Sequence, residues 1–372
     1  MNMLRRSLLQ VTLSAGCGLV LAGMVHLSSP VSAATTWDTT AAAKHMDKRQ
    51  TWWMNWPKAK RDHDTSCVSC HTALPYAMGR TSLREMMGIK TEAPPEQEML
   101  GYVTKRVNNW AEMEPFYGEK SGPRKPEESR VAEAVLNALI LARYDSVNST
   151  MSPTTKTAFD NMWALQFTTG EAAGGWEWLN FHYAPWEGDT SAYYGATLAT
   201  LAVGYTPDSY KKFPEIQRNL TLLRGYLQKN YNAQPLLNKT LLLWSSARFT
   251  GLLTKEQKTA LVNEIESHQE KDGGWSLATL GSWKRRDNTA IDTRTDGYAT
   301  AISILALKSA GLPNKAPQIK QGVGWLVTHQ DATTGMWTAS SLNKQRPPES
   351  DPALFMSDSA TGFAVLALQA TR

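Results

Sequence analysis

The sequence has 372 residues, of which 42% are hydrophobic and 20% are charged, and its formal net charge at pH 7 is +5. This composition allows a large buried core and argues against an intrinsically disordered chain. The small positive charge, with no concentrated basic patch, gives no reason to expect a nucleic-acid partner.

Residues 1–33 have the pattern of a secretory signal. Arg5 and Arg6 precede the uncharged run 7–27, and small residues then lead to a predicted cleavage site after Ala33. The apolar run is almost long enough to span a bilayer, so a retained membrane anchor is the alternative. We therefore expect an exported protein of the bacterial periplasm or cell envelope.

The next element is a cysteine motif near the start of the mature chain. The signal contains Cys17, so the mature protein has only Cys67 and Cys70, and His71 follows the second directly in CVSCH. In an exported protein, C-x-x-C-H is typical of c-type haem attachment. On a tight helical turn the two sulfur atoms can reach the two vinyl groups of the porphyrin, and the next side chain brings an imidazole to the iron. The motif predicts one covalent haem c, attached through Cys67 and Cys70, with His71 as the proximal iron ligand.

Two other interpretations use the same residues. A zinc ion would need His63, Cys67, Cys70 and His71, but these four are crowded into nine residues and lack the usual distant second pair of ligands. A redox-active C-x-x-C disulfide would need a thioredoxin-like βαβ setting, which the sequence does not predict.

The iron ligand opposite His71 is not specified by the sequence. Met78 lies seven residues after His71 and would project from the same helix face, so it cannot reach the other side of the ring. We take Met113, in NNWAEMEPFYG, or His182 as the distal candidates. Further candidates are Met86, Met87, Met99, His45 and His63. A methionine ligand would suit electron transfer, whereas an open position would admit oxygen, peroxide or substrate.

The rest of the chain contains internal repeats. Three segments share a glutamine, a short polar link and a tryptophan: QFTTGEAAGGW, QEKDGGW and QDATTGMW. Each precedes a helix rich in small residues that begins with Asp or Ser as the expected N-cap: GDTSAYYGATLATLAVG, TDGYATAISILALKSAG and SDSATGFAVLALQA. Gly311 is the expected stop of the second helix.

Two segments, ESRVAEAVLNALILARYD and NKTLLLWSSARFTGLL, carry the helix without the tryptophan motif, and the cysteine segment is interpreted as a modified copy. Single helical hairpins cannot bury their apolar faces, so we expect them to stack or close into a ring.

These repeats resemble those of squalene-hopene cyclases and other class II terpene cyclases, and a similar hairpin builds protein prenyltransferase β-subunits. The similarity covers about residues 100–372. It implies an all-α fold, an α/α toroid of inner and outer helices around a central cavity, in which Gln-Trp pairs brace successive hairpins. We assign residues 34–100 to the haem-attachment segment, packed on the toroid, and residues 101–372 to the toroid repeats.

The resemblance does not extend to the cyclase reaction. Class II cyclases protonate their substrate with an Asp-x-Asp-Asp motif before an inner helix, but residues 296–299 are Asp-Gly-Tyr-Ala. Tyr298 replaces the proton donor, and a phenol is too weak an acid for this step. An N-cap role for Asp296 and a bond from Asp292 to Arg294 explain the remaining carboxylates. The chain also lacks the inner-helix cysteine with which prenyltransferases bind zinc.

Residues 174–196 contain more aromatic residues than a repeat needs. Together with the start of the helix at 297, they give the predicted pocket residues: Trp178, His182, Trp186, Glu187, Tyr193, Tyr194, Asp296 and Tyr298. Aromatic walls with a few polar groups suit a hydrophobic, isoprenoid-like ligand, although core packing explains the same residues. If His182 or Glu187 faced the haem, either could act as a distal ligand or proton donor.

Three hypotheses follow for an exported monohaem protein. The first is electron transfer with a periplasmic redox partner, and the second is haem-dependent oxidation of a hydrophobic substrate held in the toroid. The third is binding of hopanoid-like lipids with a structural haem, which would suit peripheral association with the membrane. No nicotinamide, flavin or nucleotide motif suggests another cofactor.

Overall fold

The computed structural model describes residues 36–372, and the predicted signal and its cleavage site lie outside these residues. The regular structure of the described chain is almost entirely helical, with twelve α-helices and one two-stranded hairpin, β1 (Lys60–Arg61) and β2 (Thr65–Ser66). The even-numbered helices are α2 (Ala73–Met87), α4 (Lys125–Ser146), α6 (Ser191–Tyr205), α8 (Leu236–Ser245), α10 (Gly297–Ser309) and α12 (Asp351–Ala370). The odd-numbered helices are α1 (Thr39–Asn55), α3 (Pro94–Asn108), α5 (Pro153–Ala164), α7 (Pro214–Asn230), α9 (Lys255–Ser267) and α11 (Pro317–Thr328).

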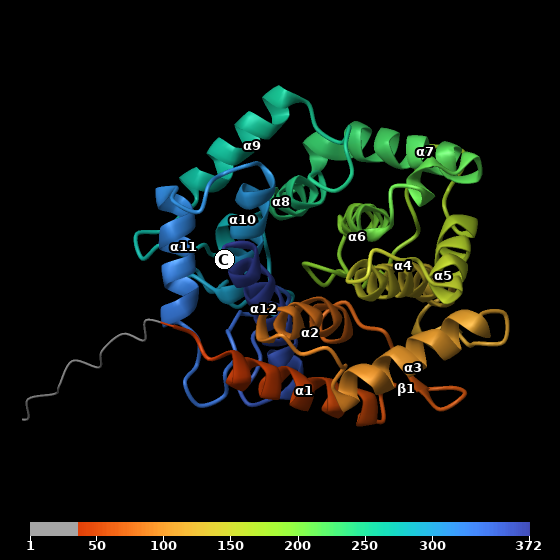
Figure 1. The fold of residues 1–372 in the computed structure, drawn as a ribbon, viewed down its shortest axis with the longest axis horizontal. Coiled ribbons are helices and arrows are strands. Elements are labelled where there is room, and N and C mark those ends of the chain that lie inside the picture. Colours follow the sequence, from red (N-terminus) through yellow and green to blue (C-terminus); the bar gives the residue numbers. More distant parts are fainter. Residues whose placement is uncertain (1–35) are drawn as a thin grey trace, which may run out of the picture. The chain divides into compact units, whose positions relative to one another are not determined.

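The even-numbered helices form a closed inner ring. Each contacts the next even-numbered helix, and α12 contacts α2, so that the last inner helix meets the first. The odd-numbered helices lie outside this ring, as Figure 1 shows. The expected all-α fold of the α/α toroid type is therefore confirmed.

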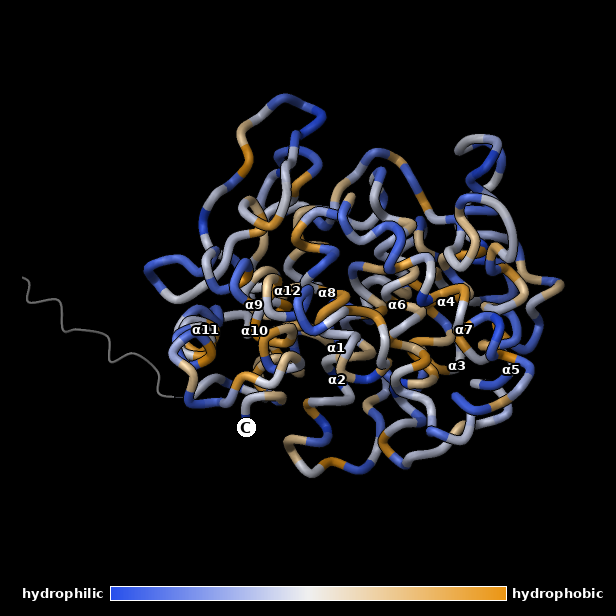
Figure 2. The backbone as a smooth tube through the Cα atoms, turned by 90° about the horizontal axis from the view of Figure 1, so that it is seen from above, coloured by the Kyte–Doolittle hydropathy of each residue, from blue (hydrophilic) through white to orange (hydrophobic). Residues whose placement is uncertain are grey.

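The two layers differ in composition for a physical reason. In α10 every residue from Gly297 to Leu307 is buried, because neighbouring inner helices and an outer helix surround it. In the outer helix α9 only Leu261 and Ile265 are buried, since its other face meets solvent. Figure 2 shows the most hydrophobic stretches of the backbone on the inner helices and mostly hydrophilic residues in the loops.

The glutamine and tryptophan of each repeat brace the outer layer. Trp176, Trp275 and Trp337 are fully buried, and each indole N–H donates to a carbonyl near the end of the preceding outer helix, at 2.7–2.8 Å: Met162, Ile265 and Leu326. The glutamine side chains reach the following outer element, where they donate to the carbonyls of Asn219, Gln318 and Asp38 at 3.2, 3.0 and 2.9 Å. The last bond, from Gln330 to the residue before α1, closes the outer layer.

The start of the last helix differs from the expectation. The sequence suggested an N-cap close to SDSATGF, but α12 begins at Asp351, and Ser350 is its N-cap. Asp358 therefore lies within the helix, where it is buried and accepts hydrogen bonds from Arg49 Nε at 2.7 Å and Nη2 at 3.0 Å. A long-range ion pair has replaced the local capping role that the sequence pattern favoured. α12 is also the one described helix long and apolar enough to cross a membrane, but most of it is buried in the ring.

The backbones of α2 and α12 approach each other closely at two glycines. A Cβ added to Gly79 of α2 would lie 2.8 Å from the carbonyl oxygen of Gly362 in α12. A Cβ added to Gly362 would lie 2.4 Å from the carbonyl oxygen of Pro75. These glycines allow the first and last inner helices to approach closely enough to close the ring.

We predict that Gly362→Ala destabilises the protein, because the new methyl group overlaps the backbone of α2. A loss of about 1–3 kcal/mol is typical of overpacking, and backbone overlap places this case at the upper end. Thermal unfolding followed by circular dichroism measures the effect.

Gly324→Ala in α11 is the matched control. A Cβ there meets nothing within 4 Å, so helix propensity alone acts and the variant is expected to be as stable as the wild type or more stable. Equal melting temperatures for Gly362→Ala and the wild type would contradict the proposed role of this contact.

Candidate functional site

A cavity of about 370 Å³ lies at the end of the ring where the inner helices α2, α4 and α12 begin. Its walls come from the end of α1, the β1–β2 hairpin, the first half of α4, the loop before α6, and the loop and first turns leading into α12. Many of the lining side chains are aromatic: Trp53, Trp56, Phe116, Tyr117, Tyr183, Trp186 and Phe355. The cavity therefore joins segments from almost the whole length of the chain.

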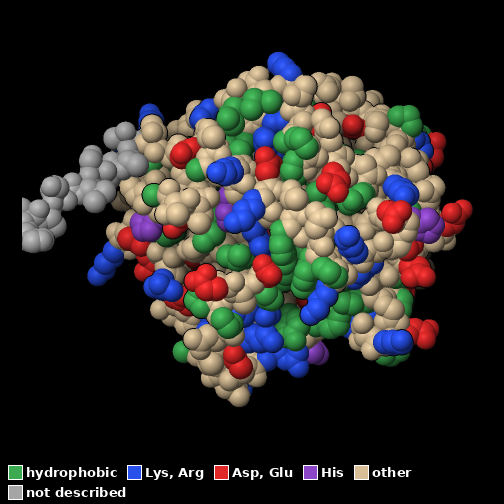
Figure 3. All heavy atoms as spheres, turned by 90° about the horizontal axis from the view of Figure 1, so that it is seen from below, with side chains coloured by type: hydrophobic (Ala, Val, Ile, Leu, Met, Phe, Trp, Pro, Cys, Tyr) green, Lys and Arg blue, Asp and Glu red, His purple; other side chains and the backbone are tan. Residues whose placement is uncertain are grey.

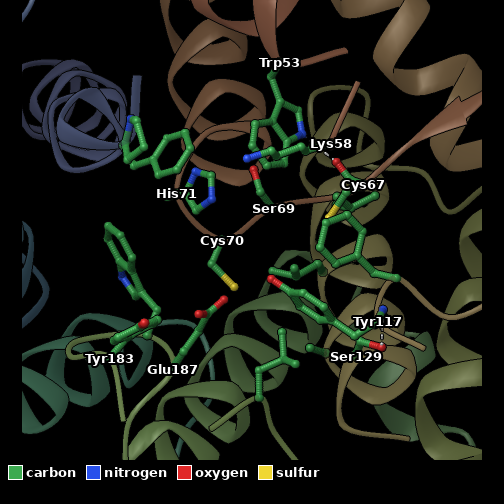
Figure 4. A pocket seen from close by; sticks show the side chains of 18 of the residues that line it. Trp53, Lys58, Cys67, Ser69, Cys70, His71, Tyr117, Ser129, Tyr183 and Glu187 are labelled. Carbon is green, nitrogen blue, oxygen red and sulfur yellow. Dashed lines mark hydrogen bonds between the residues drawn. The ribbon is translucent and has the colours of Figure 1, made fainter. Parts of the chain in front are cut away.

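The C-x-x-C-H motif forms one wall of this cavity. Cys67, Cys70 and His71 all line it, and Figure 4 shows the three side chains around the same space. The backbone N–H of Cys67 donates to the carbonyl of Ala59 at 2.8 Å, which attaches the motif to the hairpin. Ser69 Oγ accepts from the N–H groups of Thr72 and Ala73 at 3.2 and 3.0 Å and so tightens the turn into α2.

Neither Cys67 nor Cys70 is in a disulfide among the described residues. Burial raises the pKa of both thiols, so both are protonated at neutral pH. The zinc interpretation also finds no support in the geometry. The described residues contain no group of three or more His, Cys, Asp and Glu side chains that could hold a metal ion. His63 pairs with Asp62 at 3.0 Å and does not line the cavity.

The imidazole of His71 is held on two sides. It stacks on Phe355, with ring centroids 3.9 Å apart, and meets the edge of Trp53 at 4.9 Å. Its Nδ1 lies 2.9 Å from the hydroxyl of Thr72, and that hydroxyl donates to Asp358 at 2.8 Å. Because the hydroxyl proton is committed to Asp358, the hydroxyl oxygen can only accept from His71, which places the ring proton on Nδ1.

Nε2 of His71 is then an unprotonated nitrogen with a free lone pair. Burial, followed by the charges of Arg49 and Arg346, lowers the pKa of His71 to about 3. The imidazole is therefore neutral at any physiological pH, as an iron or other metal ligand must be. The Thr72–Asp358–Arg49 chain is the kind of hydrogen-bonded support that fixes the orientation of a ligating histidine.

Arg106 fixes the hairpin that carries the motif. It is almost completely buried, and its guanidinium donates to Glu133 of α4 at 2.5 and 3.1 Å. It also donates to Asp62 at 3.0 Å and to Thr65 at 2.8 Å, both in the hairpin. The Arg106 side chain of α3 therefore connects α4 to the hairpin that precedes Cys67.

Glu187 faces the motif from the opposite wall. The N–H groups of Phe181 and Tyr183 both donate to its carbonyl at 2.8 Å, and its own N–H donates to Tyr183 at 2.9 Å. This tight loop directs the carboxyl group into the cavity near Cys70, as Figure 4 shows. Burial raises the pKa of Glu187 to about 7, and the charge of Lys125 acts in the opposite direction. No hydrogen bond to this carboxyl group is present among the described residues.

The predicted pocket residues are divided by the structure. Trp186 and Glu187 line the cavity. Four others lie buried outside the lining: Trp178, Tyr193, Tyr194 and Tyr298. Of these, Trp178 donates to the Trp186 carbonyl at 3.0 Å, and Tyr298 accepts from the Trp186 indole at 3.3 Å, so both support the cavity wall.

Two predicted pocket residues lie away from the cavity. His182 is exposed and pairs with Asp189 at 2.8 Å. Asp296 is the N-cap of α10, where it accepts from the N–H groups of Ala299 and Leu277 at 2.8 and 2.7 Å. It borders a separate polar cleft of about 360 Å³.

The two residues predicted as distal iron ligands, Met113 and His182, both lie outside the cavity lining. Met113 is buried, and His182 is exposed. Among the described residues, Met356 and His71 are the only methionine and histidine in the lining. Met356 follows Phe355, the residue that stacks on His71, in the first turns of α12. Sequence reasoning missed it because nothing local in α12 links Met356 to a motif 285 residues earlier.

The family comparison concerns the last helices. Residues 250–371 match the family model described as squalene-hopene cyclase C-terminal domain. This match covers α9 to α12 and supports a class II terpene cyclase-like fold, but it begins far beyond the C-x-x-C-H segment. Comparison with curated proteins gave no match.

We predict that Glu187 makes stability depend on pH near neutrality. Its folded-state pKa of about 7 lies above the ordinary value of 4.5, so its contribution is complete below about pH 4.5 and is lost as the pH rises through 7. Glu187→Gln removes this titration. The free energy of unfolding of the variant minus that of the wild type is therefore expected to increase between pH 5 and 7, by about 1.4 kcal/mol for each unit of pKa shift.

Urea unfolding at several pH values measures this difference. Glu171→Gln is the control, because Lys229 lowers the pKa of that exposed carboxyl group and it titrates below this pH range. A flat difference for Glu187→Gln, like that of the control, would show that Glu187 ionises normally.

Proposed function

We propose that this chain is an exported monohaem redox protein whose haem c is attached to Cys67 and Cys70 and occupies the toroid cavity. The observation that carries the proposal is that both thiols and the free Nε2 side of a neutral His71 line one aromatic-walled cavity. Export depends on residues 1–33, which only the sequence supports.

The residues present fit a haem group. Two protonated thiols can each add S–H across a vinyl C=C bond, which forms a thioether without an oxidant. His71, oriented by Thr72 and Asp358, would hold the iron through Nε2. The aromatic walls offer the apolar contact that a porphyrin needs and exclude water from it. A bound haem supplies one-electron chemistry at its iron, and the chain sets the polarity around it.

Two roles are compatible with such a protein. Electron transfer with a periplasmic partner would call for a strong sixth ligand, and Met356 is the one methionine that the described residues place in the lining. Haem-dependent oxidation of a hydrophobic substrate would call for an open position and a proton donor. Glu187 holds a proton near neutral pH opposite the motif, and this observation favours the second role.

Tyr298 stands at the position of the cyclase proton donor, and a phenol is too weak an acid for that step. Tyr298 is fully buried, and burial raises the pKa of its phenol. Asp296, the remaining carboxylate of the motif, is engaged with the N–H groups of α10 and Leu277. The lipid-binding hypothesis stays a prediction, which analysis of lipids that co-purify with the protein would test.

We predict that the wild-type protein, expressed with a c-haem maturation system, carries one covalent haem. A pyridine haemochrome spectrum and haem staining after denaturing electrophoresis measure it. The double variant Cys67→Ser/Cys70→Ser is expected to lose all covalent haem, because no thiol remains in the mature chain. Ser341→Ala, at another wall of the cavity, is expected to retain it. Wild-type protein without haem would overturn the proposed function.

We predict that the reduced protein binds carbon monoxide, because the described lining contains no second histidine and its one methionine, Met356, follows the residue that stacks on His71. Met356→Leu is expected to bind it equally well, as measured by the shift of the Soret band. A wild-type spectrum that carbon monoxide does not change would favour electron transfer. Recovery of binding in Met356→Leu would then identify Met356 as the sixth ligand.

A further inference from the structure

We propose that Arg61 and Arg346 bind the carboxylate groups of the ligand that occupies the toroid cavity. This inference rests on the proposed function and goes beyond it, because it assigns the polar end of the ligand. A haem carries two propionate groups, and a free amphipathic acid would present the same carboxylate chemistry.

The cavity lining contains more cationic than anionic side chains without a charged partner among the described residues. Arg106 and Glu133, both in the lining, neutralise each other in a buried pair. Three further cations line the cavity: Lys58, Arg61 and Arg346. Within the described part of the chain, none of these three forms a salt bridge. Glu187 is the one lining carboxyl group without a cationic partner, and it is largely protonated below pH 7.

Arg61 is a half-buried cation whose bonding is incomplete. Its Nη1 donates to the carbonyl of Lys60, while its buried Nε has no partner among the described residues. The guanidinium carbon lies 3.4 Å from the ring centroid of Phe116, which fixes the group at the wall. Burial, more than any other effect, lowers the pKa of Arg61.

Arg346 occupies the loop before α12, on a different wall. Its Nη2 donates to Asn343 Oδ1 at 3.2 Å, and burial lowers its pKa as well. The loop itself is well anchored, because Arg285 donates to the Ser341 carbonyl at 3.0 and 2.8 Å, and the Arg286 N–H donates to the Asn343 carbonyl at 2.9 Å. Arg346 is therefore presented by a braced loop.

The arrangement selects a class of ligand. Burying an uncompensated cation is costly, so two half-buried guanidinium groups at one cavity indicate an anionic ligand. The surface between them is aromatic, which excludes a small inorganic anion as the best fit and favours a large apolar body with acidic groups at its edge. Guanidinium groups pair with carboxylates through two parallel hydrogen bonds, so each arginine can hold one acid group. Figure 3 shows lysine and arginine side chains among apolar and acidic ones on one exposed face of the molecule.

The test uses the mature holoprotein and the variants Arg61→Gln, Arg346→Gln and their combination. Arg286→Gln is the matched control: Arg286 is exposed, lies 5.1 Å from the ring centroid of the lining residue Tyr183, and does not itself line the cavity. The pyridine haemochrome spectrum first establishes that each protein carries covalent haem. Two readouts follow, the reduction potential by spectroelectrochemical titration and calorimetric titration with palmitate.

If haem propionates are the ligands, Arg61→Gln and Arg346→Gln each lower the reduction potential more than Arg286→Gln does, because a cation that favours the reduced haem is lost. Palmitate then does not bind. If a free acid is the ligand, palmitate binds the wild type and the affinity falls at least tenfold in the double variant, with potentials equal to that of the control.

Both of these results support carboxylate binding by the two arginines. Potentials and palmitate binding that match Arg286→Gln in every variant would overturn the inference and leave the proposed haem intact. A wild-type protein without haem that also fails to bind palmitate would overturn both, and the haemochrome spectrum separates these cases.

Discussion

The backbone contact between α2 and α12 is the constraint on which the rest of the structure depends. Gly79 and Gly362 allow the first inner helix to meet the last, and only this closure turns a row of hairpins into a ring. The same closure places Thr72 against Asp358, and His71 against Phe355. The candidate site is thus built at the seam of the ring, where both ends of the described chain contribute side chains.

Buried ion pairs hold the segments around the candidate site in place. The Arg49–Asp358 pair connects α1 to α12 and orients Thr72, while Arg106 connects α3 and α4 to the hairpin before Cys67. Such pairs add little net stability, since desolvation offsets most of their attraction, but breaking them is costly and their geometry is specific. They hold the cysteine turn in one position relative to the cavity. The cations that remain without partners at the cavity are the ones that a ligand would have to satisfy.

The sequence predicted the repeats and the toroid because their signals are local. Gln, Gly and Trp recur with fixed spacing beside helices rich in small residues, and the buried indole bonds of Trp176, Trp275 and Trp337 explain that pattern. The site was predicted only in part. Trp186 and Glu187 belong to a conspicuous aromatic segment, whereas Phe355, Met356 and Arg346 belong to no motif and enter the cavity only because α12 closes the ring.

The sequence by itself determined the helical repeats, the C-x-x-C-H motif with its predicted chemistry, and the presence of Tyr298 where the resemblance would place a carboxylate. Each depends on residue types at short, fixed spacing, which a chain carries in any conformation. Only the tertiary structure decided that the motif opens into the toroid cavity, that Met113 and His182 lie outside it, and that Asp358 supports His71 instead of capping a helix. These are contacts between residues up to 286 positions apart, and they exist only once packing has closed the ring.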